Sequence, residues 1–168
     1  MNPRTELDTR YSEEEATASE WSDAVALLTA AEIAWLTTVR PNCRPHVTPL
    51  IIVWHDGGVH FCTGAQERKA KNLRENPEIV LTTGNNALNE GLDLVIEGTA
   101  ALVSDETRLR ALADAYVTKY GPEWTFEVRD GRFVGDGGPA LVYRVEPRTA
   151  FGFAKRPYGQ TRWRFTRK

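Results

Sequence analysis

Short β-forming runs separated by turn residues are the feature of this chain that most constrains its fold. The runs are rich in β-branched and aromatic residues, and they cover residues 33–39, 46–54, 59–63, 79–83, 92–103, 140–145, 150–153 and 161–165. Residues 41–45 are typical of a turn, and His55-Asp56-Gly57-Gly58 is a hairpin signal between two runs. The first half of the chain therefore predicts an antiparallel meander.

Three helical segments are inserted between these runs. The first is short and starts near Ser22, which is a residue type that caps helices. The second covers residues 64–74 and ends before Pro77. The third covers residues 104–121, with Ser104 as its expected cap and an apolar face of Leu109, Leu112, Ala113, Tyr116 and Val117. Strands and helices do not alternate as a parallel sheet requires, so the pattern predicts an antiparallel barrel or sandwich with appended helices.

Length and charge bound the organisation of the chain. Its 168 residues fit one domain, expected at 20–168, whereas the polar and acidic residues 1–19 predict a flexible N-terminal arm. The net charge of -2 shows no basic surplus and argues against nucleic-acid binding. No apolar run approaches the roughly 20 residues that a membrane span needs, and the N-terminus lacks the apolar core of a secretory signal. A cytoplasmic location is therefore expected.

The cysteines and histidines do not indicate a metal centre. Cys43 and Cys62 make no metal motif and are expected to be reduced thiols. The three histidines, His46, His55 and His60, include no pair with the spacing of metal ligands. The chain also lacks a serine nucleophile motif and a glycine-rich nucleotide loop. No catalytic residue can be named from the sequence.

The stretch from Thr63 to Leu73 carries the clearest chemical signal. A strand ends at Thr63, a short connection with a glycine follows, and Arg68 and Lys69 stand at the start of the expected helix. A helix N-terminus presents free N–H groups, and the two cations and the Thr63 hydroxyl would add donors for a phosphate. Two alternatives stay open: the cations are a solvated surface, or Glu67 neutralises them in place of a ligand.

These segments together resemble the pyridoxamine 5′-phosphate oxidase-like, flavin-binding split-barrel family. The resemblance rests on residues 34–41 and 44–49 as an opening hairpin, 63–73 as a phosphate-binding strand and helix, 92–121 as a strand and long helix, and 151–153 with 160–165 as the ending. It implies a mostly β, α+β fold with an antiparallel six-stranded split β-barrel. The ending resembles actinobacterial members, which often use the deazaflavin coenzyme F420 in place of FMN. The resemblance also implies a homodimer with the cofactor site at the interface.

The resemblance also assigns roles to individual residues. Arg68 and Lys69 match cations that bind the cofactor phosphate, Lys71 and Asn72 match positions that contact the cofactor chain, and Thr63 matches a nearby hydroxyl. His46, Val47, Thr48 and Pro49 match the strand that runs along the ring. Trp163 is a further candidate for stacking on a ring, although burial in the core is the favoured interpretation. One position departs from the family, because Glu67 stands where the oxidases often have serine.

These observations lead to a functional hypothesis. The resemblance implies an oxidoreductase that holds F420, or FMN, and transfers a hydride to a small electron-poor organic acceptor, without a membrane or nucleic acid partner. The anionic tail of F420 favours this coenzyme over FMN, because Lys71 and Arg74 add further cations. Alternatives are an FMN-dependent pyridoxamine 5′-phosphate oxidase-like enzyme, a non-catalytic flavin- or haem-binding carrier, and an interaction domain without a ligand.

Overall fold

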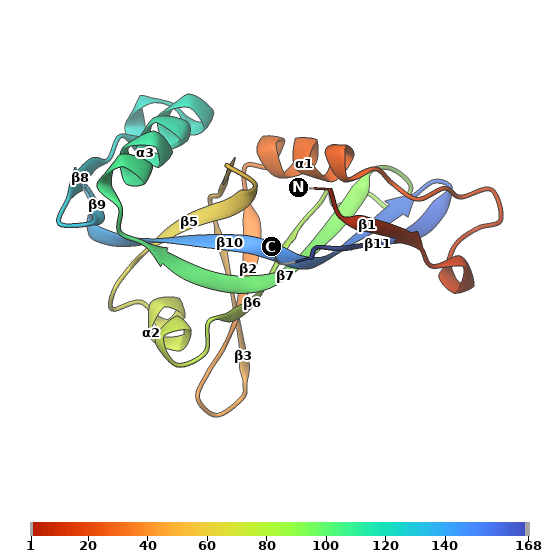
Figure 1. The fold of residues 1–168 in the computed structure, drawn as a ribbon, viewed down its shortest axis with the longest axis horizontal. Coiled ribbons are helices and arrows are strands. Elements are labelled where there is room, and N and C mark those ends of the chain that lie inside the picture. Colours follow the sequence, from red (N-terminus) through yellow and green to blue (C-terminus); the bar gives the residue numbers. More distant parts are fainter. Residues whose placement is uncertain (1, 167–168) are drawn as a thin grey trace.

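The computed structural model describes residues 2–166 and places their strands in a single antiparallel sheet with eleven strands. In Figure 1 the sheet is strongly twisted, with α1 and α3 above it and α2 below it. The helices are α1 (Trp21–Ala30), α2 (Arg68–Glu75) and α3 (Glu106–Tyr120), with short 3-10 turns η1 (Thr9–Tyr11) and η2 (Pro122–Trp124). The strands are β1 (Arg4–Leu7), β2 (Ala34–Val39), β3 (Pro45–Leu50), β4 (Val53–His55), β5 (Gly58–Gly64), β6 (Glu78–Thr83), β7 (Leu92–Val103), β8 (Glu127–Arg129), β9 (Arg132–Gly135), β10 (Gly138–Lys155) and β11 (Tyr158–Arg164).

The sheet is organised around β10, which has 18 residues and pairs with four other strands. The main path runs β1-β11-β10-β7-β6-β2-β3. Strands β5 and β9 also pair with β10, and they pair in turn with β4 and β8. The predicted mostly β fold with antiparallel strands and appended helices is therefore confirmed. The predicted number of six strands is imprecise, because the described sheet has eleven strands and its path does not close.

The C-terminal strands differ from the sequence prediction at Pro147. The prediction ended one strand at this proline and began another at Ala150, but the structure continues both as β10. The register between β10 and β7 shifts between Pro147 and Thr149, so a β-bulge accommodates the proline. Opposite it, Gly98 leaves room for the close approach of β10, since a Cβ there would lie 2.6 Å from the Glu146 carbonyl oxygen.

The predicted strand at 46–54 is interrupted at Ile51 and Ile52, which separate β3 from β4. The C-terminal end of α3 holds this interruption. The Ile52 N–H donates to the Tyr120 hydroxyl at 3.0 Å, and the Ile52 carbonyl accepts from the Lys119 ammonium at 2.8 Å. These bonds satisfy backbone groups that a continuous strand would have paired.

The buried side chains form two clusters on the sheet. The larger one surrounds Leu36, Phe61 and Trp163 and packs against α1, while the smaller one lies beneath α3 and contains Leu112 and Tyr116. Burial of α3 follows the predicted apolar face, although its N-cap is Asp105 and not Ser104. The second helix begins at Arg68, four residues later than predicted, because Glu67 closes a turn onto the Gly64 carbonyl.

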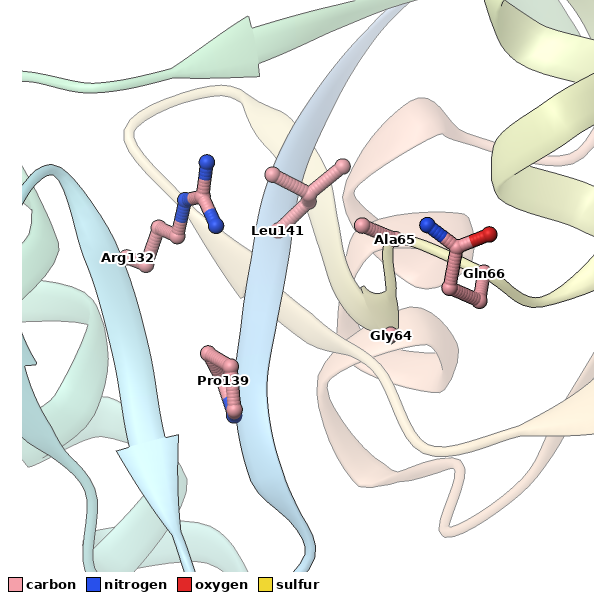
Figure 2. Close-up of a pocket in the computed structure, with 6 residues that line it drawn as sticks. All are labelled: Gly64, Ala65, Gln66, Arg132, Pro139 and Leu141. Atoms are coloured by element: carbon pink, nitrogen blue, oxygen red, sulfur yellow. The ribbon is translucent and has the colours of Figure 1, made fainter.

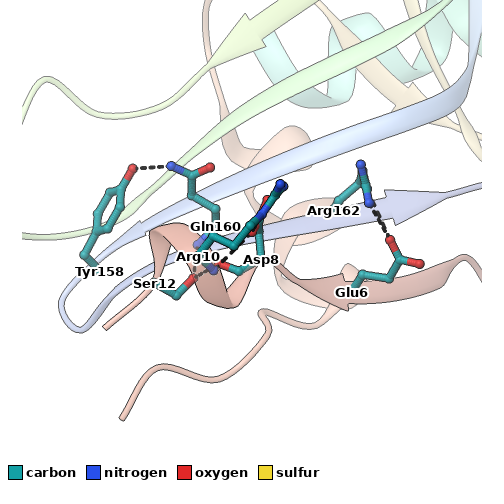
Figure 3. A network of polar contacts seen from close by, with 7 residues as sticks. All are labelled: Glu6, Asp8, Arg10, Ser12, Tyr158, Gln160 and Arg162. Atoms are coloured by element: carbon teal, nitrogen blue, oxygen red, sulfur yellow. Dashed lines mark hydrogen bonds and ion pairs between the residues drawn. The ribbon is translucent and has the colours of Figure 1, made fainter. Parts of the chain in front are cut away.

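The N-terminal segment, expected to be a flexible arm, is partly built into the sheet. Strand β1 pairs along its whole length with β11, and Glu6 accepts hydrogen bonds from the Arg162 guanidinium. Figure 3 shows this pair and the neighbouring contact between Arg10 and Asp8. The Ser12 hydroxyl continues the attachment by accepting from the Gln160 N–H at 3.0 Å. Pairing with β11 thus places residues 4–7 in the sheet, although the composition of the segment is polar.

No helix among residues 2–166 combines the length and the apolar character needed to cross a membrane.

Candidate functional site

Strand β3 forms one end of the sheet path and carries the predicted ring-binding residues. It pairs with β2 alone, so its outward N–H and C=O groups have no strand partner among residues 2–166. Side chains alternate along it: His46 and Thr48 are half-buried, whereas Val47 and Pro49 are exposed. The edge therefore offers backbone hydrogen-bonding groups to a flat ligand.

Helix α2 is attached to this edge through β2. The buried Asn72 side chain donates from Nδ2 to the Thr38 hydroxyl at 2.9 Å. Thr38 stands opposite His46 in the register of β2 and β3, and its hydroxyl donates to the His46 carbonyl at 3.4 Å. These contacts bring together two predicted segments that lie about twenty residues apart in the chain.

The cations of α2 affect the pKa of His46 on β3. Partial burial lowers the pKa of His46, and the nearby cations Arg40, Lys69 and Arg68 lower it further. A lowered pKa keeps the imidazole neutral near pH 7, so it has one ring nitrogen that accepts and one that donates. This segment of the site is therefore cationic on the helix side and neutral on the strand side.

Three buried polar atoms of β3 and α2 have no hydrogen-bond partner among the described residues. They are His46 Nδ1, Thr48 Oγ1 and Asn72 Oδ1. Buried polar atoms are paired in the great majority of cases, so three unpaired atoms in one region fit a ligand that supplies partners. The residues present thus fit a phosphorylated ring cofactor with polar edges.

The start of α2 presents its two cations differently. The Arg68 side chain is exposed and makes no ion pair with the described residues. The Lys69 ammonium is largely buried and pairs with the Glu67 carboxylate. Glu67 also accepts from the Gly64 N–H at 2.8 Å. The predicted alternative in which Glu67 neutralises a cation is therefore realised at Lys69 and not at Arg68.

A pocket of about 360 Å³ opens beside this helix start. Gly64, Ala65 and Gln66 line it from the turn before α2, and Arg132, Pro139 and Leu141 line it from β9 and β10. Figure 2 shows Arg132 and Gln66 on opposite sides of β10. Thr63, the predicted hydroxyl, is buried just before this turn and lies opposite Leu141. Sequence reasoning missed Arg132, because only the β8–β9 hairpin brings it near residue 64.

The outer face of the long sheet carries a largely apolar row of side chains. Residues that pair across strands lie on the same face, and this row includes Trp35, Val95 and Phe151, with Thr82 between Trp35 and Val95. Trp35 is 51% exposed, and Val47 on the neighbouring strand is 52% exposed. A second pocket, of about 370 Å³, lies at the far end of the row beside Phe151 and Arg162.

Trp163 is separate from these features. Its side chain is completely buried in the larger core cluster and makes an edge contact with Trp21 at 5.3 Å between ring centroids. The structure therefore places it in the core, as the favoured sequence interpretation expected, and brings the other nine predicted site residues to β3, β5 and α2. Among residues 2–166, no group of three or more His, Cys, Asp or Glu side chains is placed to hold a metal ion.

Comparisons with known proteins find similarity in sequence and in fold. A family model described as pyridoxamine 5′-phosphate oxidase matches residues 22–151. No curated protein sequence matches the chain. The conserved hypothetical protein Rv2991 from Mycobacterium tuberculosis is similar in structure, with a TM-score of 0.68, 18% identity, and coverage of 87% of this chain and 91% of that chain.

Two further solved structures carry cofactor names. A FAD-binding protein from Mesorhizobium loti has a TM-score of 0.60 and 14% identity, with coverage of 96% of this chain and 98% of that chain. A protein named F420 reductase has a TM-score of 0.55 and 21% identity, with coverage of 74% of this chain and 93% of that chain. At these identities the structural similarity establishes the fold alone.

Proposed function

The chain belongs to the pyridoxamine 5′-phosphate oxidase family, and from this premise we propose that it is an oxidoreductase dependent on the deazaflavin F420. The family and the named neighbours support a flavin-binding oxidoreductase as the broader class. The substrate in this proposal is a small electron-poor organic acceptor of a hydride, such as an enone, quinone or imine. A cytoplasmic location stays a prediction.

One observation carries the proposal. The cationic start of α2 lies beside the edge strand β3, and three buried polar atoms of these two elements have no partner among the described residues. A phosphorylated flavin-like molecule offers an anion for the helix and a polar ring edge for the strand. An interaction domain without a ligand would leave these atoms unpaired at a cost of about 1–3 kcal/mol each.

The residues of the chain would then bind and orient the cofactor. Arg68, with two donors in a fixed fork, and Lys69 would hold the phosphate, and the N–H groups at the start of α2 would add to them. The backbone of residues 46–49 would fix the ring edge. When bound, the reduced ring supplies the hydride, and the protein supplies position and the exclusion of water.

The charges near α2 support the choice of F420 over FMN. Lys71 and Arg74 lie further along the helix, and Arg132 faces the pocket beside its start. None of these three cations forms an ion pair with the described residues. The F420 tail carries several carboxylates, and such cations favour it more than they favour the single phosphate of FMN.

We also propose that a second copy of the chain covers the outer face of the sheet. The half-exposed Trp35 and Val47 belong to an apolar face beside the edge strand β3. Aromatic side chains are enriched in the centre of protein interfaces, and a twofold dimer would bury both copies of this face. The ring site on β3 would then lie at the interface.

Fluorescence titration of the purified protein with F420 and, separately, with FMN tests the cofactor. We expect tighter binding of F420, followed by oxidation of reduced F420 when quinones or enones are added. Preferential binding of FMN would move the protein to the FMN-dependent branch. Binding of neither cofactor to the folded protein would overturn the proposed function.

Sedimentation velocity tests the dimer. We expect Trp35→Arg to convert a dimer into monomers, because it places a charge in the apolar centre of the interface. Leu88→Arg is a matched control, since Leu88 is 86% exposed and lies in the connection between β6 and β7. A wild-type protein that sediments as a monomer at micromolar concentration would exclude this interface.

A further inference from the structure

Glu67 occupies the N-cap position of α2 but does not act as a helix cap. Its side chain makes no hydrogen bond to the first-turn N–H groups of the helix. One carboxylate oxygen instead accepts from the Gly64 N–H at 2.8 Å, and the other accepts from the Lys69 ammonium. An internal carboxylate therefore holds two of the donors that a phosphate at this helix start would use.

The carboxylate is firmly ionised in this position. Partial burial raises the pKa of Glu67, but hydrogen bonds from Lys69 and Gly64 outweigh the burial and leave the pKa below its ordinary value. About half of the side chain is exposed, so solvent screens part of its charge. A phosphate that binds here must compete with this negative charge or lie beside it.

The two classes of phosphate differ in charge. A phosphate monoester carries about −1.5 to −2 near pH 7, because its second pKa is about 6. A phosphate diester has a single ionisable group and carries one negative charge. Repulsion grows in proportion to the product of the charges, so a fixed carboxylate disfavours the monoester almost twice as strongly.

We propose that Glu67 is a specificity-determining residue that shifts the preference of the start of α2 from a phosphomonoester towards a phosphodiester. This inference rests on the proposed function, because F420 carries its phosphate between the ribityl chain and the tail, whereas FMN ends in a monoester. The two cations, Arg68 and Lys69, still attract the single charge of a diester. Selection thus comes from a repulsive group added to an attractive site.

Glu67→Gln tests this role, because it removes the charge and keeps the size and the hydrogen-bond acceptor. We expect the variant to bind FMN about tenfold more tightly and F420 at most about threefold more tightly, since solvent screens a half-exposed charge. Riboflavin, which has no phosphate, should bind the variant and the wild type equally. Glu75→Gln is the matched control, because it removes one acid from the other end of the same helix.

The outcomes separate this inference from the proposed function. An unchanged ratio of FMN to F420 affinity in Glu67→Gln would overturn the role of Glu67, even if F420 binds the wild type. If neither cofactor binds the wild type, the proposed function fails, and NMR titration with ethyl phosphate and diethyl phosphate still decides the inference. We then expect Glu67→Gln to strengthen binding of ethyl phosphate more than that of diethyl phosphate, with shifts in the α2 amides. Equal gains for both phosphates would contradict it.

Discussion

The N-termini of α2 and α3 solve the same problem in opposite ways. Every helix begins with N–H groups that lack a partner within the helix and with a partial positive charge. In α3 the Asp105 carboxylate accepts from the Arg108 N–H at 2.9 Å, and Glu106 adds an acid to the first turn. In α2 the first turn has no acid and begins with Arg68 and Lys69.

The difference separates a helix start that is complete from one that is left open for a ligand. The buried face of α3 contains Leu109, Leu112 and Tyr116, so its local chemistry and its packing both stabilise the fold. The short helix α2 concentrates positive charge where the helix dipole is already positive, and Glu67 compensates only Lys69. Local rules of stability that are broken in one place commonly mark a functional site.

Removal of the α2 cations should produce the largest effect on this comparison. We expect Arg68→Ala with Lys69→Ala to weaken F420 binding by about 4 kcal/mol, roughly a thousandfold, because two charge-assisted bonds to the phosphate are lost. Fluorescence titration measures this loss. Stability should change by no more than about 0.5 kcal/mol, since removal of the two cations also removes a misfit with the helix dipole.

The matched control removes two cations from α3. Arg108→Ala with Arg110→Ala changes the net charge equally at the start of the other helix. We expect this variant to bind F420 like the wild type. Equal losses in the two variants would mean that the overall charge of the protein attracts the cofactor and that the start of α2 has no special role.

Acid should lower the free energy of unfolding through His60, which is buried beside α3. His60 is 3% exposed, and the Tyr116 hydroxyl of α3 donates to its carbonyl at 3.3 Å. Burial, followed by the charges of Arg144 and His55, lowers the pKa of His60 to about 4. In the unfolded chain the pKa of His60 is about 6.5, so the unfolded state binds more protons below this pH. The contribution of His60 to the free energy of unfolding is therefore full above about pH 6.5 and falls by about 3 kcal/mol towards pH 4.

Urea unfolding between pH 7 and pH 4 measures this effect. We expect His60→Gln to have a flatter dependence of the free energy of unfolding on pH than the wild type, whatever its stability at pH 7. His55→Gln is the control, because His55 is an exposed neighbour whose charge is a smaller cause of the lowered pKa of His60 than burial, and it should keep most of the wild-type slope. A slope in His60→Gln equal to that of the wild type would contradict the buried neutral state of His60.

The N-cap of α3 gives a smaller effect that sharpens the contrast with α2. Asp105→Ala should lower the free energy of unfolding by about 1 kcal/mol, because the Arg108 N–H loses its partner. Asp105→Asn should retain most of this stability, since asparagine caps helices nearly as well. Affinity for F420 should stay the same in both variants. A clear loss of affinity in Asp105→Ala would show that the two helix starts are coupled.

The sequence predicted the longer strands, where the local composition alone indicates the structure. Strands such as β2 and β7 are rich in β-branched residues, and this composition is visible without a structure. The short strands β1, β8 and β9 have three or four residues each, too few for a clear sequence signal. They exist because a neighbouring strand pairs with them, which is a property of the tertiary fold.

The candidate site divides in the same way. The residue types at 63–72 indicated phosphate chemistry, but the sequence contained no sign that Asn72 would bond to Thr38 and bring α2 to β3. The approach of Arg132 to the turn at Gly64 likewise depends on the β8–β9 hairpin beside β10. Residue types are local information, whereas the partners of a site are set by the topology of the sheet.

The first-turn acid of α3 should give the smallest effect, and its dependence on salt identifies its physical origin. Glu106 interacts with the helix dipole and forms an ion pair with Arg110 at 2.7 Å, four residues on. Both partners are largely exposed, so Glu106→Gln should cost about 0.5 kcal/mol in low salt. At 1 M NaCl the Debye length is about 3 Å, and the cost measured by urea unfolding should disappear. A cost that persists in high salt would mean that Glu106 stabilises α3 by packing or hydrogen bonding, and the electrostatic contrast with α2 would then rest on Asp105 alone.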